Sequence, residues 1–225
     1  MSEKTLTLLI ESFPKILLPG LTTTVPLTLI SFGIGLVLAL VTALVQVARI
    51  PVLRQLARFY VWVFRGTPLL VQLFVVFYGM PDLGILLDAF PSAVIVFSLN
   101  TGAYASETIR ATIESVPVGQ LEAGYCVGMS YLQVMFRIIL PQALRTAFPS
   151  LGNTLIGLVK DTSLAAMITV SEMLHATRSI ASRNFQYLWL YIEVGVIYLL
   201  ISTVMNAVQR RLEKKLQPRG VSYRA

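Results

Sequence analysis

The sequence predicts an all-α polytopic membrane protein with five transmembrane helices. Of its 225 residues, 56% are hydrophobic and only 13% are charged, and the mean hydropathy is +0.74. A soluble domain carries roughly a quarter charged residues. Residues 16–48 contain no charged residue, although about 20 apolar residues are enough to cross the hydrocarbon core. Further apolar stretches follow, so we expect a single transmembrane domain over residues 1–225.

The five spans are expected at about 21–47, 57–79, 90–114, 147–167 and 185–209. The first begins in the region of Thr22, Thr23, Thr24 and Pro26 and ends before Pro51. The second contains the residues "RGTP" (65–68), which predict either a kink or, preferably, the edge of the membrane. The segment 168–184 is expected to be an outer loop, and "QRRLEKK" follows the fifth span.

The Lys and Arg residues beside the spans predict an N-outside, C-inside orientation. Twelve lie on the side of the loop 48–58, the segment 108–148 and the tail, against four on the opposite side. Cytoplasmic segments carry the excess of basic residues. The +7 net charge is therefore read as a topological signal, and no nucleic-acid partner is expected. Glu3, Lys4, Glu11 and Lys15 precede the first long apolar run, which argues against a cleavable signal.

The cytoplasmic segment 117–141 is too polar to span a membrane and too regular for a linker. Pro117 suits the start of a helix, and Leu121, Tyr125, Gly128 and Leu132 recur at helical spacing, so they are expected to share one face. Gly128 would let another surface approach closely, and Pro141 limits how far the helix continues. The residues alone leave two alternatives open, a docking element for a protein and an amphipathic helix that lies on lipid.

A motif in this segment is similar to the "EAA" loop of ABC-importer permeases. That pattern is E-A-A, three residues, G, nine residues and I-x-L-P, and here Glu122, Ala123, Gly124, Gly128 and 138–141 match it except at Gly124. "FRGTPLLVQLF" (64–74), "SLNTGAYASETIRATIESVPVGQ" (98–120) and "LVKDTSLA" (158–165) resemble the polar amino-acid permeases. The resemblance covers about 20–215. "RFYVWVFRGTPLLVQLF" and "YGMPDLGILLDAFPSAVI" look most like the cystine permeases.

The resemblance implies a subunit of an importer in the bacterial cytoplasmic (inner) membrane. Two permeases, expected to be identical copies, would pair in the bilayer, two cytoplasmic ATPase subunits would bind ATP-Mg, and an extracytoplasmic binding protein would deliver the amino acid. The expected substrate is L-cystine, with a basic or other polar amino acid such as arginine, histidine or glutamine as the alternative. The ATPase would receive the coupling segment at Glu122, Ala123, Gly124, Gly128 and Leu132. The chain itself has no phosphate-binding G-x-x-x-x-G-K-[ST] sequence, so no enzyme activity or cofactor is expected in it.

Ionisable residues inside predicted spans mark the candidate substrate pocket. A charge at the centre of a span costs roughly 2.5–3.5 kcal/mol on insertion scales, so such residues usually face the protein interior. A zwitterionic amino acid needs an anionic group, a cationic group and polar partners. One candidate set lies on the third span and the other on the fourth: Asn100, Thr101, Tyr104 and Glu107, then Lys160, Asp161, Thr162 and Ser163.

These assignments leave alternatives open. Glu107 could instead pair with Arg110 near the cytosol, and Lys160 with Asp161 could form a structural ion pair. Glu193 is expected in a buried hydrogen bond or a dimer contact rather than at substrate. Two other classes were considered. A membrane enzyme or metal site lacks the necessary cluster, because the chain has one His and one Cys. An ion-driven transporter or channel would leave the coupling segment unexplained.

Overall fold

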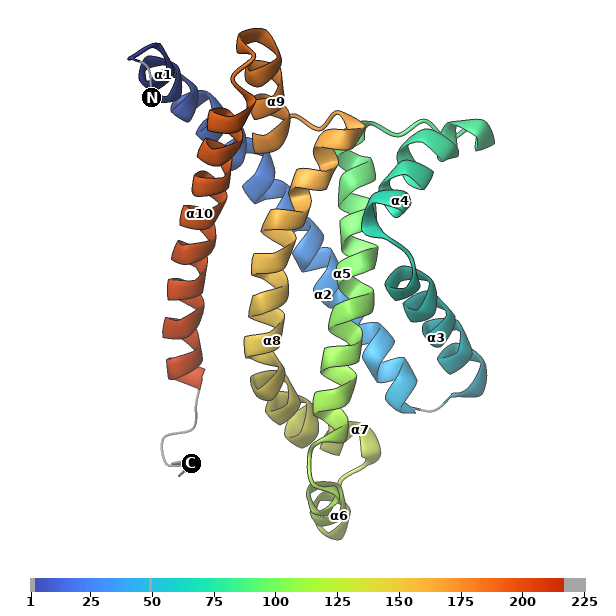
Figure 1. Cartoon of the computed structure of the whole chain (residues 1–225). Coiled ribbons are helices and arrows are strands. Elements are labelled where there is room, and N and C mark those ends of the chain that lie inside the picture. The colour runs from blue at the N-terminus through green and yellow to red at the C-terminus, as the bar shows by residue number, and fades with distance from the viewer. Residues whose placement is uncertain (1–2, 49, 217–225) are drawn as a thin grey trace.

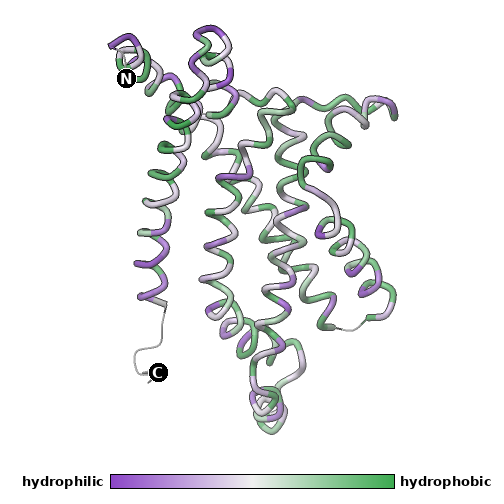
Figure 2. The backbone as a smooth tube through the Cα atoms, in the orientation of Figure 1, coloured by the Kyte–Doolittle hydropathy of each residue, from purple (hydrophilic) through white to green (hydrophobic). Residues whose placement is uncertain are grey.

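A computed structural model describes residues 3–48 and 50–216, and every regular element in them is helical (Figure 1). Arg49, Arg219 and Arg224, which contributed to the orientation argument, lie outside the described residues. The short helices α6 and α7 lie at one end of the molecule, and α1 and α9 lie at the opposite end (Figure 1). Figure 2 shows apolar colour along most of the tube between these ends, with hydrophilic colour at the lower end of α10.

The first helix begins well before the expected start near residue 21. Helix α1 (Glu3–Pro19) continues through a π-helical turn (Gly20–Thr24) into α2 (Val25–Ala48). The threonines taken as a start signal sit inside this helix, where Thr22 Oγ1 donates to the Leu18 carbonyl at 3.0 Å. A hydroxyl that is satisfied by the preceding turn does not have to cap a helix, so that prediction was wrong.

The second predicted span is broken in its middle. Helix α3 (Pro51–Gly66) ends at Thr67, whose backbone is extended, and α4 (Leu69–Phe74) begins after Pro68. Helix α4 continues through a π turn (Val75–Gly79) and a 3₁₀ turn (Met80–Leu83), and the two parts of the span meet at 106°. Proline disfavours the helical conformation in the residue before it. The structure thus shows the kink considered for residues 65–68, while their interpretation as a membrane edge stays a prediction.

Helix α5 (Ala89–Glu114) matches the expected third span, 90–114, and packs along α2. Small residues allow the close approach. A Cβ on Gly35 would lie 3.0 Å from Thr101 Cβ, and one on Gly102 would lie 3.0 Å from Leu38 Cβ. Lipid-embedded helices associate through such small-residue contacts because the tails compete equally for apolar surface.

The segment 117–141 forms two helices rather than one. Helix α6 (Val118–Cys126) ends before Gly128, which has φ +79°, and α7 (Tyr131–Val134) starts at Ser130 with a capping box to Gln133. The expected single apolar face is therefore interrupted at Gly128, because a residue in the left-handed conformation ends a helix. A π turn (Met135–Ile139) joins α7 to α8 (Leu140–Asp161), so Pro141 lies in a continuing helix and does not end it.

The C-terminal third contains more helix than expected. Helix α8 continues as a 3₁₀ helix (Thr162–Ile168). The predicted outer loop is mostly α9 (Met173–Asn184), which precedes α10 (Tyr187–Leu216). Two uninterrupted helices of the described chain, Glu3–Ala48 and Tyr187–Lys215, are long and apolar enough to cross a membrane, and the bent pairs α3–α4 and α7–α9 raise this to four. Helix α5 does not meet these criteria, and neighbouring helices bury many of its residues.

Candidate functional site

Asn100 and Gln72 hold the break between α3 and α4. The Gln72 amide nitrogen donates to the carbonyls of Phe64 and Thr67 at 2.9 and 3.1 Å, and Asn100 Nδ2 donates to the Phe64 carbonyl at 3.3 Å. Asn100 Nδ2 also lies 3.0 Å from Gln72 Oε1. Carbonyl groups freed at a helix end inside a membrane need internal donors. The Asn100 amide predicted to meet substrate is therefore engaged in the chain's own backbone.

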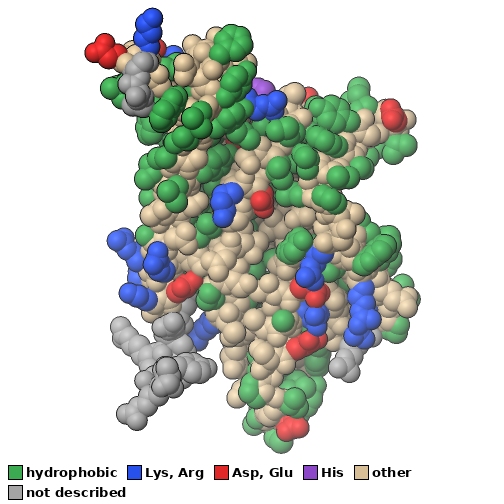
Figure 3. All heavy atoms as spheres, viewed as in Figure 1, with side chains coloured by type: hydrophobic (Ala, Val, Ile, Leu, Met, Phe, Trp, Pro, Cys, Tyr) green, Lys and Arg blue, Asp and Glu red, His purple; other side chains and the backbone are tan. Residues whose placement is uncertain are grey.

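Glu107 is the centre of an ion-pair cluster between α3 and α5. Its carboxylate pairs with Arg110 at 2.8 Å and with Arg65 at 3.8 Å, and it accepts from Gln46 Nε2 at 3.2 Å. Arg110 also pairs with Glu114 at 2.7 Å. The Arg110 alternative for Glu107 is thus confirmed. Figure 3 shows basic and acidic side chains gathered over the lower parts of α3 and α5.

Tyr104 and Thr101 point in different directions from α5. Tyr104 is exposed, and the Arg65 guanidinium lies 5.3 Å from the centre of its ring. Thr101 is buried against Gly35 of α2. The helical spacing of Asn100, Tyr104 and Glu107 correctly placed them on one side, while Thr101 serves the packing of two helices.

At the end of α8, Lys160 and Asp161 are exposed and form no ion pair with any described residue. The structural ion pair considered for them is therefore not present. Thr162 is fully buried, and its hydroxyl donates to the Val159 carbonyl at 2.6 Å. Ser163 is half-buried. These four consecutive residues therefore have different environments: the charged pair is accessible, the Thr162 hydroxyl is buried, and Ser163 is half-buried.

Glu172 was not singled out as a functional residue, although it is fully buried. Its carboxylate accepts from the Tyr198 hydroxyl at 2.7 Å and from the His175 backbone N–H at 2.7 Å. Glu172 thereby caps α9 and ties it to α10, since Tyr198 lies on α10. Burial raises the pKa of the Glu172 carboxyl, while the hydrogen bonds act in the opposite direction. The sequence placed Glu172 in the expected outer loop 168–184, so it gave no signal for a buried helix cap.

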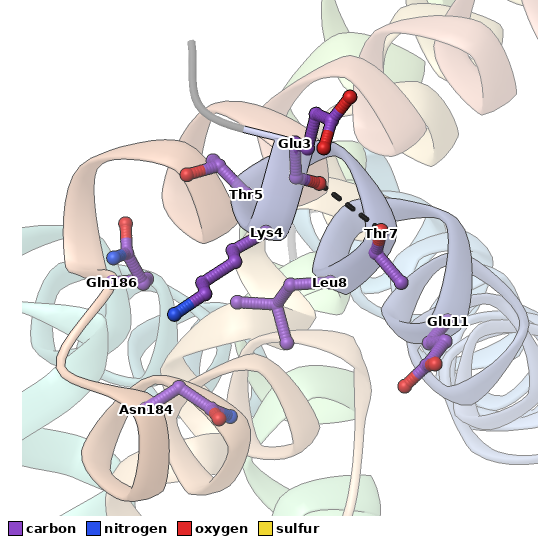
Figure 4. Close-up of a pocket in the computed structure, with 8 residues that line it drawn as sticks. All are labelled: Glu3, Lys4, Thr5, Thr7, Leu8, Glu11, Asn184 and Gln186. Carbon is purple, nitrogen blue, oxygen red and sulfur yellow. Dashed lines mark hydrogen bonds between the residues drawn. The ribbon is translucent and has the colours of Figure 1, made fainter.

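Glu193 makes a partly buried hydrogen bond, one of the two roles that the sequence suggested for it. Ser12 Oγ donates to Glu193 Oε2 at 2.6 Å, which joins α1 to α10. A cavity of about 590 Å³ lies nearby, between α1 and the α9–α10 connection (Figure 4). Figure 4 shows the Lys4 side chain pointing from α1 toward the segment that carries Asn184 and Gln186. None of the predicted site residues lines this cavity.

The α6–α7 end presents an apolar surface. Val127 and Leu132 are 75% and 64% exposed, and Val118 and Tyr125 are also exposed. Glu122 and Ala123 are exposed on α6 as well. Gly124 faces inward instead, because a Cβ there would lie 2.5 Å from Val134 Cγ2. Gly128 has open space around it and a positive φ, so its glycine is required by the turn and not by close approach of another part of this chain.

Comparison with known proteins identifies the family that has this architecture. Residues 31–218 match the sequence profile described as "Binding-protein-dependent transport system inner membrane component". The L-cystine transport system permease protein TcyB of Bacillus subtilis is 51% identical over 207 residues, covering 92% of this chain and 88% of that protein. The arginine transport system permease protein ArtQ of the same organism is 35% identical, covering 89% and 92%.

Solved structures show the same architecture. A crystal structure of an amino acid ABC transporter with histidines matches with a TM-score of 0.88 and 31% identity, over 96% of this chain and 100% of that one. An inward-facing MetNI methionine ABC transporter has a TM-score of 0.71 at 17% identity, over 97% and 100%, which shows the fold alone. This chain therefore belongs to the family of binding-protein-dependent transport system inner membrane components, as a permease subunit of an amino-acid ABC importer in the inner membrane.

Proposed function

We propose that this permease carries L-cystine. The observation that supports this substrate is the 51% identity to the L-cystine permease of Bacillus subtilis, against 35% to the arginine permease of the same organism. Family membership implies that a separate ATPase supplies the energy and that a binding protein delivers the amino acid. It also removes the ion-driven transporter and the membrane enzyme that the sequence alone had left open.

Lys160 and Asp161 are the best candidates for direct contact with the amino acid. They offer both signs of charge, they are exposed in the single chain, and neither forms an ion pair with a described residue. A zwitterion can satisfy both at once, with its carboxylate on the lysine and its ammonium on the aspartate. Tyr104 and Ser163 are further candidates. Asn100, Thr101, Glu107 and Thr162 instead shape the site, because each is engaged with other parts of the chain.

The partner permease is proposed to be a second copy that covers one side of α8. Ser150, Asn153, Lys160 and Asp161 are all exposed there, at spacings that place them along one side of the helix. Polar and charged groups facing lipid are costly and usually face protein or water. Two copies related by a two-fold axis would place both stripes toward a shared interior, and two-fold dimers are the commonest assembly.

The α6–α7 end is proposed to dock on the ATPase from the cytosol, with the N-terminus outside and five spans in all. Its exposed Val127, Leu132 and Tyr125 form an apolar surface that no described part of the chain covers, and surfaces of this kind mark contacts with proteins. Glu122 and Ala123 flank it. Gly124 and Gly128 support the surface from within, as the packing and turn residues of α6 and α7.

The substrate is tested in liposomes that contain the permease, its ATPase and its binding protein. We expect ATP-driven uptake of labelled L-cystine, with arginine, histidine and glutamine as matched competitors. Uptake of arginine in preference to cystine would reject cystine while leaving the importer assignment intact. Asp161→Asn and Lys160→Gln are expected to lower cystine uptake by about tenfold or more, since each removes a charge-assisted hydrogen bond worth roughly 1.5–3 kcal/mol.

A further inference from the structure

We propose that Arg54 and Arg58 of α3 bind the phosphate of an anionic phospholipid headgroup. Both arginines line a cavity of about 290 Å³ between α2, α3 and α5, together with Gln46, Trp62, Glu107, Arg110 and Glu114. Arg54 and Arg58 are four residues apart, so they lie on the same face of α3. The cavity shares Glu107 with the proposed substrate site, but Arg54 and Arg58 take no part in that site. The inference rests on the proposed N-outside orientation, which places the loop 48–58 in the cytosol.

The cavity holds more positive charge than the chain neutralises. Its two acids are already engaged, since Glu107 pairs with Arg110 and Arg65, and Glu114 pairs with Arg110. Arg54 and Arg58 form no ion pair with any described residue. No acidic residue occurs between Glu11 and Asp82 in the sequence, so neither α2 nor α3 supplies one. The lining thus has two arginines left over for an anion from outside the chain.

Arg54 also has an unmet hydrogen-bond donor. Its Nε is buried and has no hydrogen-bond partner in the described structure. Guanidinium groups match the oxygens of phosphate in geometry as well as charge. A buried polar atom without a partner costs free energy, and a phosphate oxygen that enters the cavity would remove this cost.

The rim of the cavity indicates a lipid rather than a soluble phosphate. Trp62 lines the cavity and is 70% exposed, and Phe59 is 62% exposed with its ring centre 5.9 Å from that of Trp62. Leu56 on the same helix is 60% exposed. Tryptophan is enriched at the membrane–water interface, and a basic helix with an apolar aromatic side lies in that plane. A headgroup would enter the cavity while its acyl chains follow the apolar side of α3.

The test uses the complete permease–ATPase complex, purified with phosphatidylglycerol or with phosphatidylcholine and measured by native mass spectrometry. We expect wild-type complex to retain phosphatidylglycerol in preference to phosphatidylcholine. Arg54→Gln with Arg58→Gln should weaken that retention by about tenfold or more, since it removes the charge-assisted hydrogen bonds to the phosphate. The matched control is Arg210→Gln with Arg211→Gln, two exposed arginines of α10 that do not line the cavity, which should change retention by less than about twofold.

Several results would overturn the proposal. Equal phosphatidylglycerol retention in both double variants would show that the cavity holds no headgroup. Binding of inorganic phosphate to the wild type, lost in Arg54→Gln with Arg58→Gln and unaffected by added phosphatidylglycerol, would assign the cavity to soluble phosphate. Loss of the ATPase from that variant, with phosphatidylglycerol still bound, would assign the arginines to a protein contact. Each measurement is made without substrate, so a failure of the cystine assignment would leave the result unchanged.

Discussion

Asn100 Nδ2 on α5 and Gln72 Oε1 on α4 are 3.0 Å apart, and both residues also donate to the Phe64 carbonyl at the end of α3. Two side chains from α4 and α5 therefore satisfy a carbonyl group that is left free at the end of α3. The break at Thr67–Pro68 is held in a fixed geometry by these side chains, where a freely bending hinge would leave carbonyl groups unsatisfied.

Gln72→Leu is expected to destabilise the permease. It removes the part-buried hydrogen bonds to the Phe64 and Thr67 carbonyls, and a typical hydrogen bond contributes about 0.5–1.5 kcal/mol. The melting temperature of the purified complex, followed by intrinsic fluorescence, measures the effect. Thr203→Ala serves as the control, because Thr203 is exposed and bonds only within its own helix. An equal melting temperature for both variants would remove the structural role assigned to Gln72.

Glu107→Gln and Asp161→Asn should separate stability from transport. Glu107 neutralises Arg110 and Arg65, so its replacement should lower the melting temperature, with uptake falling in step with the amount of folded complex. Asp161 is exposed and unpaired, so its replacement should lower uptake while the melting temperature is unchanged. Parallel measurements of both quantities in both variants check this. A fully stable Glu107→Gln variant without uptake would return Glu107 to the substrate pocket.

Gly124→Ala should loosen α6 from α7. The added methyl would lie 2.5 Å from Val134 Cγ2, and valine has little freedom to turn away. Overpacking of this kind typically costs about 1–3 kcal/mol. We expect less ATPase to co-purify with Gly124→Ala, and recovery when Val134→Ala is added. Unchanged co-purification in the single variant would show that α6 tolerates displacement.

Val127→Asp and Leu132→Asp are expected to release the ATPase from the permease. A buried charge at an apolar contact is unfavourable, whereas Ser115→Asp adds the same charge at an exposed polar position and serves as control. Gly128→Trp is a poorer test, because its backbone conformation at φ +79° is strained for any side chain. ATPase binding is measured by pull-down of tagged permease. Retention in both aspartate variants would favour a helix that lies on lipid.

Glu172 should make the stability of the permease depend on pH. Its pKa in the folded protein is raised by burial above the value of about 4.3 in unfolded chains. The folded state therefore binds the Glu172 proton more tightly than the unfolded state does. The stability that this protonated carboxyl contributes is lost as the pH rises from the unfolded-state pKa through the folded-state pKa. Melting temperatures across this window should fall more steeply with pH in the wild type than in Glu172→Gln. Identical slopes would show that the carboxyl titrates normally.

The sequence predicted the helical class better than it predicted the course of the helices. Helix α5 was placed within one residue, between Asp88 at its start and Ser115 after its end. The start near residue 21 was wrong because the Thr22 hydroxyl bonds to the preceding turn of its own helix and caps nothing. The break at Pro68 was undervalued because its partners, Gln72 and Asn100, come from other helices. Thr101 and Thr162 were included in the pocket because sequence adjacency does not show which neighbour a hydroxyl faces.

The exposed charges of α8 also bear on how the subunit is made. A newly inserted copy presents Lys160 and Asp161 on its outer surface, at a cost of roughly 2.5–3.5 kcal/mol for each charge that meets hydrocarbon. An orphan subunit is therefore strained in the bilayer until it is covered. The same two residues that suit an amino acid would then favour pairing with a second copy, because the pairing removes both charges from the hydrocarbon.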